Sequence, residues 1–370
     1  MAISPVSLDL QITPDVSGHG DLGIGCVGAG FIMADCHLPA YRAAGFRVVG
    51  ITSRGSQSAV EAAQRHGLST VYPDLDELLA DERVEVVDLA IPPHRQLAAI
   101  EQICAAPRRP RGVLAQKPLG ANLSEAIRAV EACEQAGVVL SVNQNMRYDQ
   151  SIRACKTLLN RGHLGEPVLA TIEMRAIPHW MPWQAEQGWC TLRIMSIHHL
   201  DTFRYLFGDP DRIYASTRPD PRTGFPHTDG ICLYLLEYDA NGLRCSAWDD
   251  VWSGPAREGA GEDKYIRWRV EGTRGLAVGS IGWPDYPDGS PSTIRFSTLD
   301  EPGRWFEPSW DLRWFPDAFA GPMGQLLVAL NRGEQPLITG RDNLRTMALV
   351  EAAYRSAERH AAVCPADLLG

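Results

Sequence analysis

Strand-like apolar runs alternate with helix-like segments between residues 21 and 145, and this alternation is the feature that most limits how the chain can fold. The runs at 22–27, 84–91 and 112–116 are almost continuously apolar, which is typical of strands buried on both faces. Amphipathic helices between such strands would cover both faces of a parallel sheet. The alternation therefore predicts a doubly wound α/β domain.

The expected elements of this domain follow from apolar periodicity and from helix start and stop signals. We expect strands at 22–27, 47–51, 84–91, 112–116 and 138–142, and helices at 31–44, 57–66, 74–80, 95–105 and 124–136. Ser124 is the expected N-cap of the last helix, and Gly137 is expected to end it.

A glycine pair lies between the first strand and the first helix, in the order Gly28-Ala29-Gly30. The first glycine permits a tight turn and the second lets the backbone approach a pyrophosphate, which the helix N-terminus attracts. Met33 occupies the third glycine position of this fingerprint, so the helix must pack on the strand in another way. The setting predicts a Rossmann domain that binds a dinucleotide.

The end of the second strand bears on which cofactor binds. An acid there would bind the ribose 2′-hydroxyl of NAD, but the strand ends Thr52-Ser53-Arg54 without one. Ser53 and Arg54 could hold the 2′-phosphate of NADP, although Arg54 could equally stack on the adenine. We therefore expect NAD(P), with a preference for NADP.

The composition changes after the predicted Rossmann domain, because all ten tryptophans lie between Trp180 and Trp314. Strand-like segments at 168–175, 231–238, 243–248 and 265–271 and helices at 324–331 and 343–361 indicate an α+β domain with a large, mostly antiparallel sheet. The expected organisation is a tail at 1–20, a Rossmann domain at 21–145 and an α+β domain at 146–370. We expect the last helices to pack back on the Rossmann domain.

The bulk properties exclude several classes of partner. A net charge of −10 and a pI near 5.5 argue against nucleic acid, and the short basic cluster at 108–111 is expected in a surface loop. No run approaches the roughly 20 apolar residues of a membrane span. Nine dispersed cysteines without a Cys-x-x-Cys pair suggest reduced thiols. Neighbouring His198 and His199 would point apart on a helix, so no metal site is expected. We expect a cytoplasmic protein.

Four stretches of the sequence resemble one known group, the Gfo/Idh/MocA family of oxidoreductases. They are Gly28–Ile32 with His37–Tyr41 behind it, Ala90–Pro93, Gln116–Leu119 (similar to the family's Glu-Lys-Pro motif), and Ile197–Asp201 followed by Arg204–Gly208 (similar to its His-x-x-Asp helix).

The resemblance implies hydride transfer between NAD(P) and a carbinol carbon of a sugar, sugar derivative or cyclitol. It places Lys117 beside the nicotinamide and the substrate hydroxyl, and it makes His198 the acid or base. Lys117 also ends a predicted parallel strand, where ligands of such sheets bind. The family further implies a homodimer or homotetramer formed through the second domain's sheet.

The candidate site residues fall into two sets. The expected cofactor contacts are Gly28, Gly30, Phe31, Ile32, Ser53, Arg54, Ile91, Pro92, His94, Gln116 and Lys117. The expected substrate contacts are Arg147, Tyr148, Trp183, Arg193, His198 and His199.

Two departures from the family pattern affect the proton path. Gln116 replaces the glutamate of the lysine motif, and Ile194 stands where many relatives carry an aspartate. Arg193 or a substrate group could substitute for that aspartate. Asp201, one helical turn after His198, could orient the histidine or serve a structural role. One or two of a further set could touch a sugar, with Trp183 the first choice: Trp180, Trp183, Trp189, Trp248, Asp249 and Asp250.

Two other functions stay open from the sequence. Some relatives of this family oxidise, eliminate and re-reduce their substrate on bound NAD and so act as glycosidases. One relative is a cofactor-sensing co-repressor without turnover, although Lys117 and His198 argue against that function here.

Overall fold

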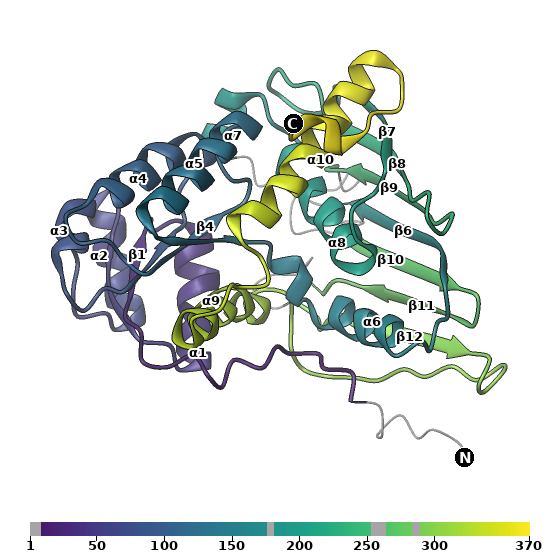
Figure 1. Cartoon of the computed structure of the whole chain (residues 1–370), viewed down its shortest axis with the longest axis horizontal. Helices are drawn as coiled ribbons and strands as arrows, with labels where there is room; N and C mark the ends of the chain where they lie inside the picture. The colour runs from purple at the N-terminus through teal and green to yellow at the C-terminus, as the bar shows by residue number, and fades with distance from the viewer. Residues whose placement is uncertain (1–8, 176–180, 253–263, 283–288) are drawn as a thin grey trace. The chain divides into compact units, whose positions relative to one another are not determined.

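The computed structural model describes residues 9–175, 181–252, 264–282 and 289–370 (Figure 1). The chain divides into two compact units. The parallel-sheet unit consists of Pro14–Asn145 and Pro316–Met347. The mixed-sheet unit consists of the residues up to Thr13, Met146–Phe315 and Ala348–Gly370. Each unit is built around its own sheet.

The parallel-sheet unit holds a five-stranded sheet in the order β2-β1-β3-β4-β5, in which every pair of neighbours is parallel. Its strands are β1 (Ile24–Val27), β2 (Val48–Thr52), β3 (Val86–Leu89), β4 (Gly112–Gln116) and β5 (Val139–Asn143). Nearly all of their residues are buried. The predicted doubly wound Rossmann fold is therefore confirmed.

Helices connect and cover these strands (Figure 1). They are α1 (Leu38–Ala44), α2 (Ser56–His66), α3 (Leu75–Ala80), α4 (Pro93–Ala105), α5 (Leu123–Ala136) and α9 (Ala320–Arg332). A π-helical turn, Ile32–His37, precedes α1 and buries Met33 completely. This wider turn accommodates a large side chain at the position where the dinucleotide fingerprint has a third glycine. Helix α4 packs against α5, and α9 contacts β4 and β5.

The start of α5 corrects one expectation. The N-cap is Asn122, whose side-chain oxygen accepts the backbone N–H of Glu125 at 3.0 Å. Ser124, the expected cap, lies inside the first turn. Asn caps a helix about as well as Ser, so the helix begins at the earlier of the two residues. Gly137 ends the helix as predicted, with φ = 70° in the left-handed region.

The mixed-sheet unit holds seven strands in the order β12-β11-β10-β6-β9-β8-β7. They are β6 (Pro167–Arg175), β7 (Arg212–Arg218), β8 (Ile231–Glu237), β9 (Arg244–Asp250), β10 (Tyr265–Gly272), β11 (Gly275–Ser280) and β12 (Thr293–Thr298). Among these described strands only β6 and β9 pair in parallel, which confirms the predicted large, mostly antiparallel sheet. Strands β7, β11 and β12 were not among the expected segments.

Helices of the same unit lie along one face of this sheet, as α6 and α8 show in Figure 1. The helices are α6 (Gln150–Asn160), α7 (Pro182–Gln187) and α8 (Ile197–Phe207), and α10 (Gly340–Arg359) contributes residues to both units. Alternate side chains on the strands are exposed on the other face. Among them are Leu169, Tyr214 and Leu233, with 36%, 46% and 51% of their surface accessible.

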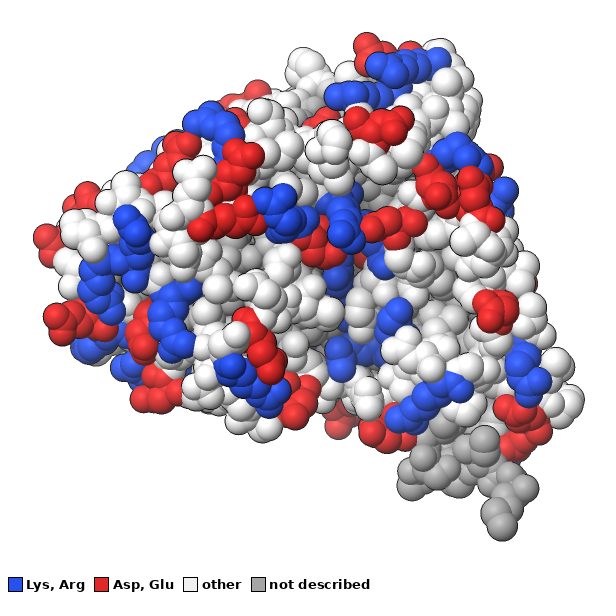
Figure 2. All heavy atoms as spheres, in the orientation of Figure 1, with Lys and Arg blue, Asp and Glu red and all other residues white. Residues whose placement is uncertain are grey.

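Acidic and basic side chains are interspersed over the face shown in Figure 2. Within the described residues, no helix has both the length and the apolar character needed to cross a membrane. The described part of the chain also gathers no group of three His, Cys, Asp or Glu side chains suited to a metal ion.

Candidate active site

The carboxyl ends of four neighbouring strands form one edge of the parallel sheet. Val27 of β1 pairs with Thr52 of β2 and with Leu89 of β3, which in turn pairs with Ala115 of β4. Because these strands are parallel, the loops that follow them leave the same edge, which is where open α/β sheets bind ligands. All of the sequence-predicted cofactor residues follow or end these four strands.

The loop after β1 has the shape that a pyrophosphate needs. Gly28 has φ = 100°, and a Cβ atom there would lie 2.3 Å from the carbonyl oxygen of Ala90, so only glycine fits. A Cβ at Gly30 would meet no described atom within 4 Å. This open space lies beside the first helical turn, whose N–H groups attract anions. The loop therefore fits the diphosphate of a dinucleotide.

The loop after β2 carries hydroxyl groups and a cation and no acid between Gly50 and Ser58. The Ser53 hydroxyl donates to the carbonyl of Gly55 at 2.6 Å and lies 2.9 Å from the Ser58 hydroxyl. The Arg54 side chain is exposed just ahead of α2. Such a combination of cation, hydroxyls and helix N-terminus suits a phosphate monoester.

Lys117 directly follows β4 and is half-buried. Burial lowers the pKa of its ammonium group to about 7. Gln96 of α4 holds this segment from both sides, since its amide donates to the Gln116 carbonyl at 2.8 Å and accepts the Gly120 N–H at 3.2 Å. Lys117 is thus a lysine whose proton affinity is matched to neutral pH and whose backbone is fixed.

A buried polar network lies next to Gln116. The His37 Nδ1 atom is 2.6 Å from Asp88, which also accepts the Tyr41 hydroxyl at 2.7 Å. With the Nδ1 proton donated to Asp88, the His37 Nε2 atom accepts the amide groups of Asn143 at 2.7 Å and Gln116 at 3.4 Å. Burial, and then the Asp88 charge, raises the pKa of Tyr41 well above its usual value.

Sequence reasoning missed this network as a unit. His37 and Tyr41 belong to a stretch that resembles the family, and Asp88 and Asn143 belong to none of the resembling stretches. One signal was available, because Asp88 is an acid inside an otherwise apolar, buried strand. A buried carboxylate needs partners, and a histidine and a tyrosine four residues apart on the first helix supply them.

The predicted substrate residues all belong to the mixed-sheet unit. His198 lies on α8 with 3% of its surface exposed, and its ring packs edge-on against Trp314 with the centroids 5.4 Å apart. His199 is fully buried, and its Nδ1 atom lies 2.9 Å from Asp249. Asp249 also accepts the hydroxyls of Ser196 and Tyr234. The structure thus gives His199 a structural partner, and its contact with substrate stays a prediction.

Arg147 and Asp201 form a buried ion pair in the same unit. The Arg147 Nε and Nη2 atoms donate to the two carboxylate oxygens at 2.6 and 2.7 Å. Arg204 lies 3.7 Å from the same carboxylate. Tyr148, the neighbour of Arg147, is 2% exposed, and burial raises the pKa of its hydroxyl. Asp201 therefore has a structural partner. A structural role is one of the two roles that the sequence leaves open for it.

Arg193 lies in the π-helical turn Leu192–Ser196 that leads into α8. Its Nη2 atom donates to Glu351 at 2.6 Å, and its guanidinium lies 5.3 Å from the ring centres of both Trp189 and Tyr354. Trp183 contacts Trp189 edge-on, at 6.4 Å between centroids. The three predicted contacts Trp183, Trp189 and Arg193 therefore form one aromatic and cationic cluster.

A carboxylate that the sequence did not reveal begins this turn. Asp229 accepts the backbone N–H groups of Cys190, Thr191 and Leu192 at 3.0, 3.2 and 2.8 Å, and it also accepts the Tyr354 hydroxyl. It accepts hydrogen bonds from backbone N–H groups that lack a partner within the helix at the start of the turn that leads into α8, which carries His198. No sequence signal linked it to a turn almost 40 residues earlier.

Three candidates for contact with a sugar remain, namely Trp180, Trp248 and Asp250. Trp180 lies outside the described residues. Trp248 packs edge-on against Tyr265 with the centroids 6.3 Å apart, and Asp250 accepts Arg222 at 2.8 Å. Both side chains therefore have partners on or beside the sheet.

Two family models match the chain in succession. The first, an oxidoreductase family with an NAD-binding Rossmann fold, GFO/IDH/MocA, covers residues 22–144. The second, a GFO/IDH/MocA C-terminal domain, covers residues 152–278. The protein is an oxidoreductase, and the chain belongs to the GFO/IDH/MocA family, as the resemblance predicted.

The relatives with assigned activities include sugar dehydrogenases. A D-apiose dehydrogenase of Paraburkholderia graminis is 28% identical over 90% of this chain and 86% of the relative. An NADP⁺-type D-xylose 1-dehydrogenase of Haloferax volcanii is 26% identical over 92% and 98%. Among solved structures, an oxidoreductase from Agrobacterium radiobacter in complex with NAD⁺, L-tartaric acid and magnesium has a TM-score of 0.77 and 25% identity, over 94% of this chain and 99% of the other.

Proposed function

We propose that this protein transfers hydride between NAD(P) and a carbinol carbon of a sugar, sugar derivative or cyclitol. The observation that carries the proposal is Lys117, a lysine with a pKa of about 7 on the sheet edge that also bears the Gly28–Gly30 loop. A structural lysine after a strand would not need a fixed backbone and a pKa near neutrality. The sugar dehydrogenases among the relatives support the substrate class.

Each proposed catalytic residue has a distinct role. When bound, the nicotinamide accepts or supplies the hydride. The Lys117 ammonium donates a hydrogen bond to the reacting oxygen of the substrate and stabilises the negative charge that develops there. His198 takes or returns the hydroxyl proton. Arg147, Tyr148, Trp183, Arg193 and His199 remain the proposed substrate set, with His199 and Arg147 acting while held by Asp249 and Asp201.

Replacing Lys117 tests this function. We expect Lys117→Ala to lower kcat/KM on a responsive sugar by about a thousandfold, in the range found for acid–base groups, while the dissociation constant of the cofactor changes by less than about fivefold. Lys156→Met, at a lysine on α6 that donates to the Leu206 carbonyl of α8, should keep its activity. Full turnover in Lys117→Ala would overturn the proposed site.

For the cofactor, we propose a preference for NADP. The exposed Arg54, the hydroxyls of Ser53 and Ser58 and the absence of an acid after β2 support it. The relatives alone do not decide, since one is of the NADP⁺ type and one solved neighbour holds NAD⁺. Arg54→Ala should weaken NADP binding about tenfold and leave NAD binding within twofold. Arg128→Ala, at an exposed arginine on α5 paired with Glu101, is the matched control. Tighter binding of NAD than of NADP by the unmodified protein would contradict the preference.

The glycosidase and co-repressor alternatives receive no support from the relatives reported above, both of which are dehydrogenases. A screen that follows nicotinamide absorbance and aglycone release on the same substrates separates the three functions. Net change in absorbance supports the dehydrogenase, aglycone release without it supports the glycosidase, and neither supports the co-repressor.

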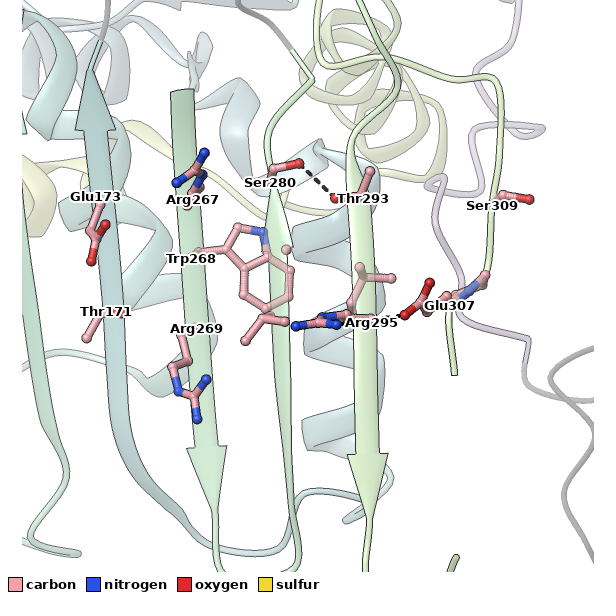
Figure 3. Close-up of a pocket in the computed structure, with 14 residues that line it drawn as sticks. Thr171, Glu173, Arg267, Trp268, Arg269, Ser280, Thr293, Arg295, Glu307 and Ser309 are labelled. Atoms are coloured by element: carbon pink, nitrogen blue, oxygen red, sulfur yellow. Dashed lines mark hydrogen bonds and ion pairs between the residues drawn. The ribbon is translucent and has the colours of Figure 1, made fainter. Parts of the chain in front are cut away.

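We also propose a homodimer or homotetramer formed through the helix-free face of the mixed sheet. Leu169, Tyr214 and Leu233 expose apolar surface there. A hollow on the sheet, shown in Figure 3, combines charges of both signs. Its lining includes Glu173, Arg267, Arg269, Arg295 and Glu307. None of the predicted site residues lines this hollow, so it fits an assembly surface better than an active site.

Nine free thiols support the proposed cytoplasmic location.

A further inference from the structure

Two cysteines of the parallel-sheet unit lie in contact, far from each other in the sequence. Cys104 occupies the last turn of α4 and Cys133 the last turn of α5, and these two helices pack against each other. The two sulfur atoms are 3.7 Å apart. In a disulfide bond the two sulfur atoms are roughly 2.05 Å apart. Rotation of the two side chains, both near helix ends, has only a short distance to close.

The two thiols differ in exposure. Cys104 is partly accessible to solvent, whereas Cys133 is 1% exposed. A reagent in solution therefore reaches Cys104 before Cys133. This arrangement separates an attacking thiol from a resolving one.

The pKa of Cys104 also favours this thiol as the one that reacts first. When Cys104 loses its proton, Cys133 can donate a hydrogen bond to the thiolate, and this bond, followed by the nearby Arg109 charge, lowers the pKa of Cys104. Burial raises the pKa of the thiols at 26, 36, 155, 190, 232 and 245. The basic cluster at 108–111 thus has a local role, because it supplies the cation beside Cys104.

We propose that Cys104 and Cys133 form a peroxide-reactive dithiol whose oxidation joins α4 to α5. The Cys104 thiolate attacks one oxygen of hydrogen peroxide, the O–O bond breaks, and the displaced hydroxide takes a proton to give water and a sulfenic acid. The Cys133 sulfur then attacks the Cys104 sulfur, the S–O bond breaks, and the leaving hydroxide takes the Cys133 proton. Two thiols lose two electrons, and one peroxide becomes two waters.

The position of the dithiol predicts what its oxidation does. From Pro93, where α4 begins, to Cys104 the helix rises about 16 Å at roughly 1.5 Å per residue. The dithiol therefore lies at the opposite edge of the sheet from the Gly28–Gly30 loop and Lys117. We expect the disulfide to raise the thermal midpoint by tying two helices together, and to leave cofactor binding within about twofold.

The test uses the full-length protein, a small excess of hydrogen peroxide and intact-mass measurement. The expected product has lost two hydrogen atoms, and trypsin then releases the peptide 96–108 disulfide-linked to the peptide 129–147, as the lysines and arginines of the sequence dictate. Cys364→Ala, at the other partly exposed thiol, should give the same product. Cys133→Ala should instead accumulate a sulfenic acid on Cys104 that dimedone traps, and Arg109→Gln should slow the reaction severalfold.

Results of three kinds would overturn the proposal. One is oxidation of Cys104 without the linked peptides in the unmodified protein. Another is oxidation of buried thiols or Cys364 as fast as Cys104. A third is an unchanged rate in Arg109→Gln combined with a failure of dimedone to label Cys133→Ala. Because the main measurement is made on the unmodified protein, a variant that folds poorly does not spoil the test.

Discussion

Arg147 and Asp201 are joined by two parallel hydrogen bonds inside the mixed-sheet unit, with 6% and 2% of their side chains exposed. Asp201 lies one turn after His198 on α8, and Arg147 lies in the short helical segment Asn145–Tyr148 that follows β5. A planar guanidinium and a carboxylate matched in this way fix orientation as well as distance. The pair thus links the helix that carries His198 to the Asn145–Tyr148 segment.

We expect Asp201→Ala to lower the free energy of unfolding by about 3 to 5 kcal/mol, because it removes the carboxylate that pairs with the buried Arg147 charge. Urea unfolding of the unmodified protein and the variant measures the difference. The double variant with Arg147→Met should be less destabilised than the sum of the two single variants, since it removes both members of the bidentate pair together. Additive losses would show that the two side chains contribute independently.

The two glycines of the dinucleotide loop should behave differently when changed to alanine. Gly28→Ala places a Cβ 2.3 Å from the Ala90 carbonyl oxygen at φ = 100°, and should destabilise the fold. Gly30→Ala meets no described atom within 4 Å, so its stability should stay within about 1 kcal/mol, while cofactor affinity falls about tenfold. Thermal unfolding with and without cofactor measures both effects. Unchanged affinity in Gly30→Ala would place the pyrophosphate elsewhere.

The sequence predicts the parallel-sheet unit well, because each buried strand is a local apolar run bounded by turn residues. Strand 112–116 is predicted to the residue, whereas β11 and its neighbour β12 at the sheet edge lack such runs, carrying residues such as Gly279 and Arg295 between their apolar side chains. Site residues follow the same rule. Lys117 directly follows a local strand and could be found from the sequence. Asp249 contacts His199, and Asp229 contacts the turn before α8, only after the sheet has formed. No local sequence pattern encodes these two pairings.

Leu233 should control assembly if the mixed sheet is the subunit interface. It is 51% exposed on the helix-free face and pairs across the strands with Trp248. Leu233→Asp places a charge in a surface that would be desolvated, so light scattering should show a shift toward a monomer of 40.6 kDa. Leu299→Asp, at a residue 60% exposed just after β12, is the control and should assemble normally. A monomeric unmodified protein would refute the proposed oligomer.

The proposed role of Lys117 predicts the pH dependence of turnover. Its pKa is lowered to about 7 by burial, and the protonated form is the one that stabilises charge on the substrate oxygen. We therefore expect kcat/KM to fall as pH rises through roughly 7, with a slope reporting one proton. Initial rates between pH 5.5 and 9, in buffers of constant ionic strength, measure this. A rise across the same range would make Lys117 a base.

Asp149 gives the fold a pH dependence of unusual sign. It caps α6, accepting the N–H groups of Ser151 and Ile152 at 2.9 and 3.2 Å. Burial nevertheless raises the pKa of its carboxyl group to about 6, against the opposing effect of these hydrogen bonds. In the unfolded chain the carboxyl titrates near 3.9. Between these two values the native protein binds more protons than the unfolded chain.

The contribution of Asp149 to stability should therefore be largest below about pH 4 and should be lost as pH rises to about 6, by roughly 2 to 3 kcal/mol. Asp149→Asn retains an N-cap but cannot titrate. We expect the difference in unfolding free energy between the unmodified protein and this variant to change by that amount between pH 4 and pH 7, as urea unfolding at each pH would show. Subtracting the variant removes every other titrating group from the comparison. A difference that does not vary with pH would mean that the pKa of Asp149 in the native protein is not raised above its value in the unfolded chain.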